Sequence, residues 1–302
     1  MVQEVFNMKK VLIIGKNSYI GKNFCSYAKK YSAINIEAVG ASNGEWKEKS
    51  FKGYDSVLFL AGKVHQKETK QNQHEYDEIN YKLAIEVAKK TQLSEIQQFI
   101  YMSTAAVYGD AGQQKGNILI DENIIVEPNT AYGKSKRKAE ISLLELEEQW
   151  QQDENKMKVC IVRPPMVYGK ECPGNFTRLY HLALKTPIFP MVHNQRSMIA
   201  IDNLCEFLYQ LITQEKSGTY HPQDLDYIET SKLVGYMRKV NGKGILYTKK
   251  LNPFLSVAVN KIAIVEKVFG NYVYVKRISR YEGMEYQVTD VRKVLKKMKK
   301  KS

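Results

Sequence analysis

The sequence has few cysteines and histidines and no long apolar run. None of its four cysteines forms a C-x-x-C pair, and none lies near one of the five histidines at metal-ligand spacing. We therefore expect no metal site and a reducing compartment. No segment reaches the ~18 apolar residues of a spanning helix, and the first apolar run is too short for a signal peptide. These features predict a cytoplasmic protein that is at most peripheral to a membrane.

Acidic residues become scarce only towards the C-terminus. The net charge is +14. Residues 1–150 carry 20 basic and 19 acidic side chains, residues 151–240 carry 11 and 9, and residues 241–302 carry 15 and 4. Because most of the excess lies in the last segment, the sequence argues against a basic nucleic-acid face on the rest of the chain, and we expect no nucleic-acid partner.

The C-terminal residues show helical spacing. Residues 290–302 contain seven Lys or Arg, and the apolar residues among them are Val291, Val294, Leu295 and Met298. This pattern predicts a basic amphipathic helix, which is either a solvated tail or a weak contact with anionic lipid. Residues 255–269 are predicted to form a core helix, with a helix lying on a membrane surface as the alternative.

Short apolar runs alternate with amphipathic segments in the first part of the chain. We expect strands at residues 11–14, 34–39, 56–60, 99–102 and 159–162, and helices at 19–30, 75–90 and 132–150. This alternation predicts an α/β fold, a Rossmann-type doubly wound parallel sheet. The expected organisation is a mainly dinucleotide-binding domain at residues 1–170, to which a later strand can return, a smaller substrate-binding region at 171–289, and a basic tail at 290–302.

A glycine-containing loop, residues 15–21 (GKNSYIG), lies between the first strand and the first helix. A glycine there lets the chain turn sharply, and the free N–H groups of a helix start attract a pyrophosphate. The position and spacing favour a dinucleotide loop over a plain turn. Residues 39–43 offer no acid after the second strand, and Lys16 and Ser42 could meet a 2′-phosphate. We therefore favour NADP(H), with NAD(H) as the alternative.

Tyr132 and Lys136 are spaced i, i+4 and share one face of a predicted helix. A phenol has a reference pKa of about 10, and a neighbouring ammonium together with a nicotinamide cation would lower that pKa. Tyr132 could then exchange a proton with a sugar hydroxyl or ketone. Thr104, which follows a predicted strand, could hold the same oxygen.

These landmarks together resemble the extended short-chain dehydrogenase/reductases, the NAD(P)-dependent sugar epimerase/dehydratase family. The matching motifs are the glycine loop, LAG at 60–62, STAAVYG at 103–109, YGKSK at 132–136, RPPMVYG at 163–169 and RSMIAID at 196–202. Two positions depart from the family pattern. Ser18 replaces a loop glycine, and Met166 stands where many members carry Asn.

The resemblance implies roles for individual residues. It implies Thr104, Tyr132 and Lys136 as the catalytic residues, and Asn175 and Arg196, together with Thr104, as substrate contacts. Together with Lys16 and Ser42, which were assigned above from the loop sequences, the predicted cofactor site consists of Gly15, Ser18, Tyr19, Ile20, Gly21, Ala61, Gly62, Ser103, Tyr132, Lys136 and Pro164.

The resemblance also narrows the reaction. Dehydratases of the family follow the catalytic Thr with Asp-Glu, whereas this chain has Ala105 and Ala106, which cannot transfer a proton. Hydride chemistry at C4 of a UDP-sugar remains. We favour NAD(P)H-dependent reduction of a UDP-4-keto-(6-deoxy)-N-acetylhexosamine for capsule or O-antigen precursors. The alternative is a UDP-hexose or UDP-N-acetylhexosamine 4-epimerase with tightly bound NAD.

Two further expectations follow from relatives of this fold. Some relatives bind NADPH without catalysis and act as regulators, which is a more distant alternative for this chain. Members commonly dimerise through two helices per subunit. Here these would be the helices at residues 75–90 and 132–150, so we expect a homodimer.

Overall fold

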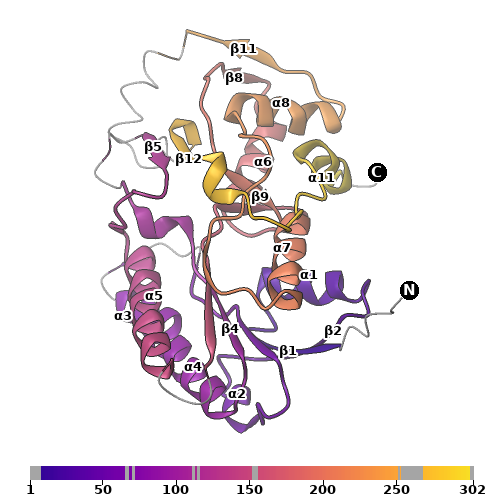
Figure 1. Ribbon diagram of the computed structural model, residues 1–302. Coiled ribbons are helices and arrows are strands. Elements are labelled where there is room, and N and C mark those ends of the chain that lie inside the picture. The colour runs from indigo at the N-terminus through magenta and orange to yellow at the C-terminus, as the bar shows by residue number, and fades with distance from the viewer. Residues whose placement is uncertain are drawn as a thin grey trace. The chain divides into compact units, whose positions relative to one another are not determined.

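The computed structural model describes residues 8–64, 68–69, 72–110, 113, 116–151, 156–250, 252 and 268–299. The chain divides into two compact units that are interleaved in sequence (Figure 1). Unit 1 comprises Met1–Val107, Pro128–Arg163 and Cys205–Tyr220, and unit 2 comprises Tyr108–Glu127, Pro164–Leu204 and His221–Ser302. The chain therefore passes between the units at more points than the expected boundaries at residues 170 and 289.

Unit 1 contains a six-stranded parallel sheet with the strand order β10-β6-β4-β3-β1-β2. The strands are β1 (Lys9–Ile14), β2 (Ile34–Val39), β3 (Ser56–Phe59), β4 (Gln98–Met102), β6 (Lys158–Val162) and β10 (Gly218–Tyr220). The order reverses between β1 and β3, and ligands of such sheets bind at the carboxyl ends of the strands at this reversal. The sheet confirms the predicted Rossmann-type α/β fold.

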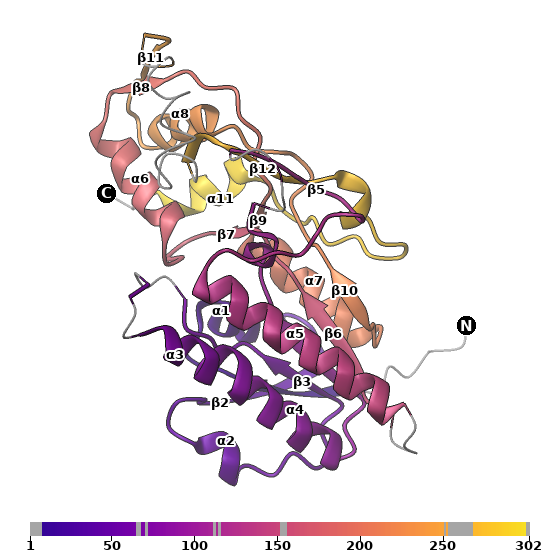
Figure 2. The same cartoon turned by 90° about the vertical axis from the view of Figure 1, so that its left-hand side faces the viewer.

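Helices cover the sheet of unit 1. They are α1 (Tyr19–Ala28), α2 (Glu45–Glu48), α3 (Gln73–Tyr76), α4 (Leu83–Leu93), α5 (Ala131–Trp150) and α7 (Ile201–Thr213), the last of which begins in unit 2. Figure 2 shows α4 and α5 running side by side, and they are in contact. The helix predicted at residues 75–90 is divided by a π-helical segment, η2 (Asp77–Lys82).

Unit 2 is built from short elements. Its strands form three parallel pairs, β5 (Asn117–Ile120) with β12 (Asn271–Tyr274), β7 (Met166–Tyr168) with β9 (Met198–Ala200), and β8 (Ile188–Pro190) with β11 (Leu246–Thr248). Its helices include α6 (Asn175–Lys185), α8 (Thr230–Val240), η4 (Lys276–Ser279) and α11 (Val291–Met298). The short helix η3 (Ala105–Tyr108) lies where the chain first leaves unit 1.

The predicted basic tail forms a helix that packs within unit 2. The Asp290 carboxylate accepts hydrogen bonds from the backbone N–H groups of Arg292 and Lys293 and thereby caps α11. Val294 and Leu295 are buried, and α11 contacts α8. The apolar side of this helix is therefore covered by protein, which corrects the expectation of a solvated tail. The helix predicted at residues 255–269 falls almost entirely outside the described residues.

The part of the chain that the structure describes has no membrane-spanning helix, no cluster of metal-binding side chains and no disulfide bond. None of its helices is long and apolar enough to cross a bilayer. No group of three or more His, Cys, Asp or Glu side chains there could hold a metal ion. The four cysteines are free thiols, three of them buried.

Candidate active site

The glycine loop joins the end of β1 to the start of α1. Gly15 has a φ of +116°, which side chains rarely allow, and a Cβ there would stand 2.8 Å from the Ala61 nitrogen at the end of β3. Ser18 is the N-cap of α1, and its Oγ accepts a hydrogen bond from the Gly21 N–H at 3.0 Å. The serine that departs from the family pattern thus stabilises the helix start.

This loop fits the phosphates of a dinucleotide. The first turn of α1 carries no acidic side chain, so its positive end is open to an anion. A Cβ at Gly21 would lie 2.9 Å from the Gly15 carbonyl oxygen, so the tight turn requires glycine at this position as well. Tyr19 and Ile20 are partly buried in the first turn of α1.

Glu45 is an acid near the end of β2 that the sequence analysis missed. Its carboxylate accepts hydrogen bonds from Lys16 Nζ at 2.6 and 2.8 Å and from the Gly40 N–H at 2.7 Å. The lysine and then the backbone bond lower the pKa of Glu45 to about 2. Residues 39–43 do lack an acid, but Glu45 folds back to the same place. Ser42 is exposed beside it.

Thr104 and Tyr132 meet at the carboxyl end of β4. Thr104 follows that strand and is hydrogen-bonded to the phenol of Tyr132, the second residue of α5. Burial raises the pKa of Tyr132 to about 12, although the Thr104 hydrogen bond acts in the opposite direction. The phenol therefore holds its proton at neutral pH. The chain by itself does not lower this pKa, and the predicted lowering by Lys136 together with a nicotinamide cation stays a prediction.

Lys136 points into the sheet. Its Nζ donates a hydrogen bond to the Met102 carbonyl oxygen at 2.8 Å and lies 4.6 Å from the centre of the Tyr101 ring. The side chain is buried, and this burial lowers the pKa of Lys136 to about 7, although Glu140 raises it. A Cβ at Gly62 would stand 3.5 Å from Nζ, an ordinary van der Waals distance, and 3.2 Å from Asn80 Oδ1, which is a tighter approach.

A buried ion pair lies one helical turn further along α5. The Glu140 carboxylate accepts hydrogen bonds from Arg163 Nε and Nη2, each at 2.8 Å, and from the Ser103 hydroxyl at 2.5 Å. Glu140 is fully buried and Arg163 nearly so. Ser103, a predicted cofactor contact, thus donates its hydroxyl hydrogen to Glu140. The pair ties the ends of β4 and β6 to α5.

Asn80 is a second residue that the sequence analysis missed. It lies in η2 and is fully buried. Its Nδ2 donates to Ser135 Oγ at 3.1 Å, its Oδ1 accepts from the Lys63 N–H at 2.8 Å, and its carbonyl oxygen accepts from the Tyr101 hydroxyl at 2.7 Å. A signal existed, because Asn80 shares helical spacing with the apolar Ala84 and Val87.

Glu68 is a third missed residue. Its carboxylate accepts hydrogen bonds from the backbone N–H groups of Ala131 at 3.0 Å and of Tyr132 at 3.2 Å. These N–H groups lie at the positive end of α5, where a carboxylate is stabilising. Nothing in the local spacing of Glu68 predicts this contact, because it spans more than 60 residues of chain.

Two of the three predicted substrate contacts, Asn175 and Arg196, lie in unit 2. Asn175 is exposed at the first position of α6, after Gly174 with a φ of +91°. Arg196 precedes β9, and its Nη1 donates to the Gly270 carbonyl oxygen at 2.9 Å. Pro164, a predicted cofactor contact, follows β6 and is the first residue of a segment of unit 2. Thr104, Tyr132 and Lys136 all belong to unit 1.

The parallel sheet, the glycine loop and the Thr104, Tyr132 and Lys136 side chains define a Rossmann-type protein of the short-chain dehydrogenase/reductase class. Residues 11–222 match the NAD dependent epimerase/dehydratase family. The chain therefore belongs to that family.

Comparisons with single proteins agree with this assignment. The chain is 28% identical over 218 residues to a UDP-glucose 4-epimerase of Vibrio cholerae, a match that covers 70% of this chain and 64% of the relative. The UDP-Glc/GlcNAc 4-epimerase of Campylobacter jejuni has a similar structure, with a TM-score of 0.72 and 16% identity over 96% of this chain and 98% of that one.

A reductase has a similar structure too. The dTDP-4-dehydrorhamnose reductase of Bacillus anthracis, in complex with NADP, has a TM-score of 0.68 and 17% identity, covering 97% of this chain and 99% of that one. At such identities the two structural matches support the fold alone. Epimerases and reductases thus share the fold of this chain, and the reaction has to be argued from its side chains.

Proposed function

We propose that this protein is an NAD(P)-dependent nucleotide-sugar enzyme that reduces the C4 ketone of a UDP-4-keto-(6-deoxy)-N-acetylhexosamine. The observation that carries the proposal is that Thr104, the Tyr132 phenol and Lys136 lie together at the carboxyl end of β4 in unit 1. A phenol that holds its proton at neutral pH can give that proton to a ketone oxygen as hydride arrives at the carbon. Reduction needs this protonation state, whereas oxidation of an alcohol needs the phenolate.

Each of the other residues has a role in this reaction. A nicotinamide cofactor bound at the glycine loop would supply the hydride. The Thr104 hydroxyl, fixed by its bonds to Tyr132 and to the Ala106 N–H at 3.1 Å, would hold the ketone oxygen. Lys136 would keep the end of β4 in place through Met102 and supply positive charge as Tyr132 loses its proton. Asn175 and Arg196 of unit 2 would contact the nucleotide sugar.

The residues after Thr104 favour hydride transfer without elimination of water. Ala105 and Ala106 begin η3, and their methyl groups cannot exchange protons. A dehydratase would need an acid and a base at these positions, as the family resemblance implies. The proposed product would be a building block for a surface polysaccharide.

The proposal is tested by turnover with a UDP-4-keto sugar and reduced cofactor. We expect one molecule of reduced cofactor to be oxidised for each molecule of product formed. We expect Tyr132→Phe to lower kcat by about 10²–10⁴-fold, while the Kd of the cofactor stays within about twofold of the native value. The matched control is Tyr31→Phe, a phenol of unit 1 that is 40% exposed. Full turnover by Tyr132→Phe would contradict the role assigned to Tyr132, and cofactor binding without turnover by the native protein would favour a non-catalytic, NADPH-binding regulator.

The Lys16–Glu45 ion pair favours a second candidate, a UDP-hexose or UDP-N-acetylhexosamine 4-epimerase with bound NAD. A carboxylate at the end of the second strand suits the ribose hydroxyl of NAD, whereas the NADP(H) favoured by the sequence would bring a phosphate close to it. The similarity to a UDP-glucose 4-epimerase points the same way. Interconversion of UDP-GlcNAc and UDP-GalNAc without added cofactor would establish this function in place of reduction.

Two partner proposals accompany this function. The homodimer would use the outer faces of α4 and α5, where Ile141 is 42% exposed. Because Val294 and Leu295 of α11 are buried in unit 2, a lipid contact by this helix would rest mainly on its basic side chains. Neither proposal affects the chemistry at Tyr132.

A further inference from the structure

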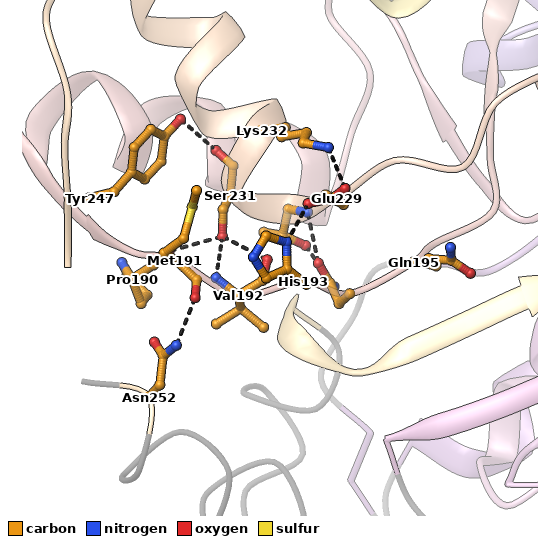
Figure 3. Close-up of polar contacts among 12 residues, drawn as sticks. Pro190, Met191, Val192, His193, Gln195, Glu229, Ser231, Lys232, Tyr247 and Asn252 are labelled. Atoms are coloured by element: carbon orange, nitrogen blue, oxygen red, sulfur yellow. Dashed lines mark hydrogen bonds and ion pairs between the residues drawn. The ribbon is translucent and has the colours of Figure 1, made fainter. Parts of the chain in front are cut away.

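The segment that leads to Arg196, residues 190–195 of unit 2, is bound to the start of α8 (Figure 3). The Ser231 hydroxyl, in the first turn of α8, accepts a hydrogen bond from the Val192 N–H at 2.9 Å. The same hydroxyl donates to the Pro190 carbonyl oxygen, also at 2.9 Å. Because these bonds are made to the backbone, the helix fixes the path of the chain just before Arg196.

Asn194 is the buried polar side chain of this segment, and it is 2% exposed. Its amide pairs with Thr230 of α8, donating to Oγ1 at 3.0 Å and accepting from the N–H at 2.9 Å. Its Nδ2 also donates to the carbonyl oxygens of Val268 at 3.3 Å and Gly270 at 3.2 Å. Asn194 therefore joins its own segment and α8 to the residues just before β12.

The Gly270 carbonyl oxygen links Asn194 to Arg196. This oxygen accepts a hydrogen bond from Arg196 Nη1 at 2.9 Å in addition to the one from Asn194. A carbonyl oxygen has two lone pairs, so it can accept both donors at once. Because Asn194 holds this carbonyl group in place, it also fixes the position of the guanidinium that the carbonyl oxygen binds.

The backbone of Arg196 is held without Asn194. Its N–H donates to the Ile228 carbonyl oxygen at 3.1 Å, and its carbonyl oxygen accepts from the Ile228 N–H at 3.0 Å. The following residue, Ser197, donates its N–H to the Tyr272 carbonyl oxygen at 2.9 Å. Loss of the Asn194 amide should therefore release the end of the Arg196 side chain while the strand around it stays in place.

The Tyr272 phenol lies near the charge of Arg196. Burial raises the pKa of Tyr272, and the positive charge of the Arg196 guanidinium acts in the opposite direction. The two groups are therefore close enough to interact electrostatically. A guanidinium next to a phenol offers several hydrogen-bond donors to an anion, and phosphate oxygens are suitable acceptors for both groups.

We propose that Asn194 is a positioning residue that orients the Arg196 guanidinium, through the Gly270 carbonyl oxygen, for contact with the diphosphate of a nucleotide sugar. The proposal rests on the substrate contact that the proposed function gives to Arg196, but it does not depend on which reaction follows. Arginine binds phosphate through paired N–H donors in one plane, so the orientation of this plane decides the strength of the contact. A guanidinium that is already held loses less conformational freedom when the ligand binds.

Titration calorimetry with UDP tests this proposal without turnover. We expect Arg196→Met to raise the Kd of UDP by about 10²-fold, because charge-assisted hydrogen bonds are lost. Asn194→Ser should raise the Kd by about tenfold, because a serine side chain ends short of the Gly270 oxygen. The matched control is Thr230→Val, which removes a hydroxyl from the same buried cluster and keeps the Asn194–Gly270 bond. Its Kd should stay within about twofold of the native value.

A double variant distinguishes positioning from a general loosening of unit 2. If Asn194 acts through Arg196, Asn194→Ser combined with Arg196→Met should bind UDP within about twofold of Arg196→Met alone. In turnover, Asn194→Ser should raise the KM of the nucleotide sugar and leave kcat within about twofold. Thermal melting shows that each variant is folded. A merely structural role for Asn194 would lower the melting temperature and leave the Kd of UDP unchanged.

Four results would overturn the proposal. They are an unchanged Kd of UDP in Asn194→Ser, an unchanged Kd in Arg196→Met, equal losses in Asn194→Ser and Thr230→Val, and a further tenfold loss in the double variant. None of these results concerns the reaction itself. A native protein that binds UDP through Arg196 and Asn194 but oxidises no reduced cofactor would support this proposal and contradict the proposed reduction.

Discussion

At the scale of single residues, the Lys16–Glu45 ion pair has the clearest bearing on cofactor choice. Lys16 belongs to the glycine loop, and Glu45 accepts its ammonium while also accepting the Gly40 N–H at the end of β2. An ionised carboxylate here competes with any phosphate that approaches the same donors. Without that carboxylate, Lys16 and the Gly40 N–H would be available to a 2′-phosphate.

We therefore expect Glu45→Gln to shift cofactor preference towards NADPH. Removing one negative charge next to a phosphate should lower the ratio of the NADPH Kd to the NADH Kd by about tenfold. Titration calorimetry of the purified protein with each cofactor measures both Kd values without turnover. The matched control is Glu48→Gln, an exposed acid at the end of the same short helix. An unchanged ratio would show that the pair plays no part in selection.

The residues of the candidate site were predictable to different degrees. Tyr132, Lys136 and the glycine loop could be found because their spacing along one helix or one turn is fixed by local geometry. Glu45 and Glu68 could not, because their partners are distant in sequence and their place depends on how loops fold back. Asn80 was predictable in part, because a polar residue on an apolar helical stripe is expected to be buried, but its hydrogen-bond partners could not be predicted.

At the scale of elements, the observed bounds of the strands and helices agree closely with those predicted from the sequence. The predicted strand at residues 34–39 coincides with β2, and the helix predicted at 132–150 begins one residue earlier as α5. Continuous apolar runs bounded by glycine or proline fix such elements well. The π-helical turn at Asp77–Lys82 was not predictable, because it depends on the buried contacts of Asn80 with Lys63 and Ser135.

The packing of α11 leads to a prediction about stability. Leu295 is fully buried within unit 2, so Leu295→Ala removes apolar contacts and leaves a cavity. We expect a loss of about 2–5 kcal/mol in the free energy of unfolding, measured by urea titration. Lys296→Ala, at the exposed neighbouring position, should change stability by less than about 0.5 kcal/mol. Equal effects of the two substitutions would mean that α11 is not part of the folded unit in solution.

The outer face of α5 carries the prediction for the homodimer. Ile141 is 42% exposed on this face, and a charged side chain there would be buried without a partner in a helix-pair interface. We expect Ile141→Asp to convert the dimer to a monomer in light scattering at micromolar concentration. Leu182→Asp, at a 51% exposed position on α6, should leave the assembly unchanged. A dimer that persists in Ile141→Asp would place the interface elsewhere.

At the scale of the whole molecule, the net charge of +14 is divided unevenly between the two units. Unit 1 has 23 basic and 19 acidic residues, whereas unit 2 has 23 and 13. The unit with the candidate catalytic residues is therefore close to neutral, and the unit that includes α8, β11 and α11 is strongly basic. This division separates the chemistry at Tyr132 from the electrostatics that would act on an anionic surface.

The stability of the whole molecule should depend on pH through Lys136. An unfolded lysine keeps its proton up to a pKa of about 10.5, whereas burial lowers the pKa of Lys136 to about 7 in the folded chain. Unfolding therefore takes up a proton between these values, and stability rises with pH across this window. From pH 7 to about 9.5, the native protein should gain about 3 kcal/mol relative to Lys136→Met, in which this titration is absent.

Urea unfolding of both proteins at several pH values measures this difference. Lys134→Met is the matched control, because Lys134 lies on the same helix but is exposed. The free energy of unfolding of Lys134→Met should change with pH in the same way as that of the native protein. Subtracting the Lys136→Met curve cancels the titration of groups that both proteins share, such as Asp224, whose pKa is raised to about 6 by burial. A constant difference between the native protein and Lys136→Met would show that the Glu140 carboxylate keeps the buried ammonium charged. Lys136 would then hold a permanent positive charge at the end of β4, and its part at Tyr132 would be electrostatic at every pH of the assay.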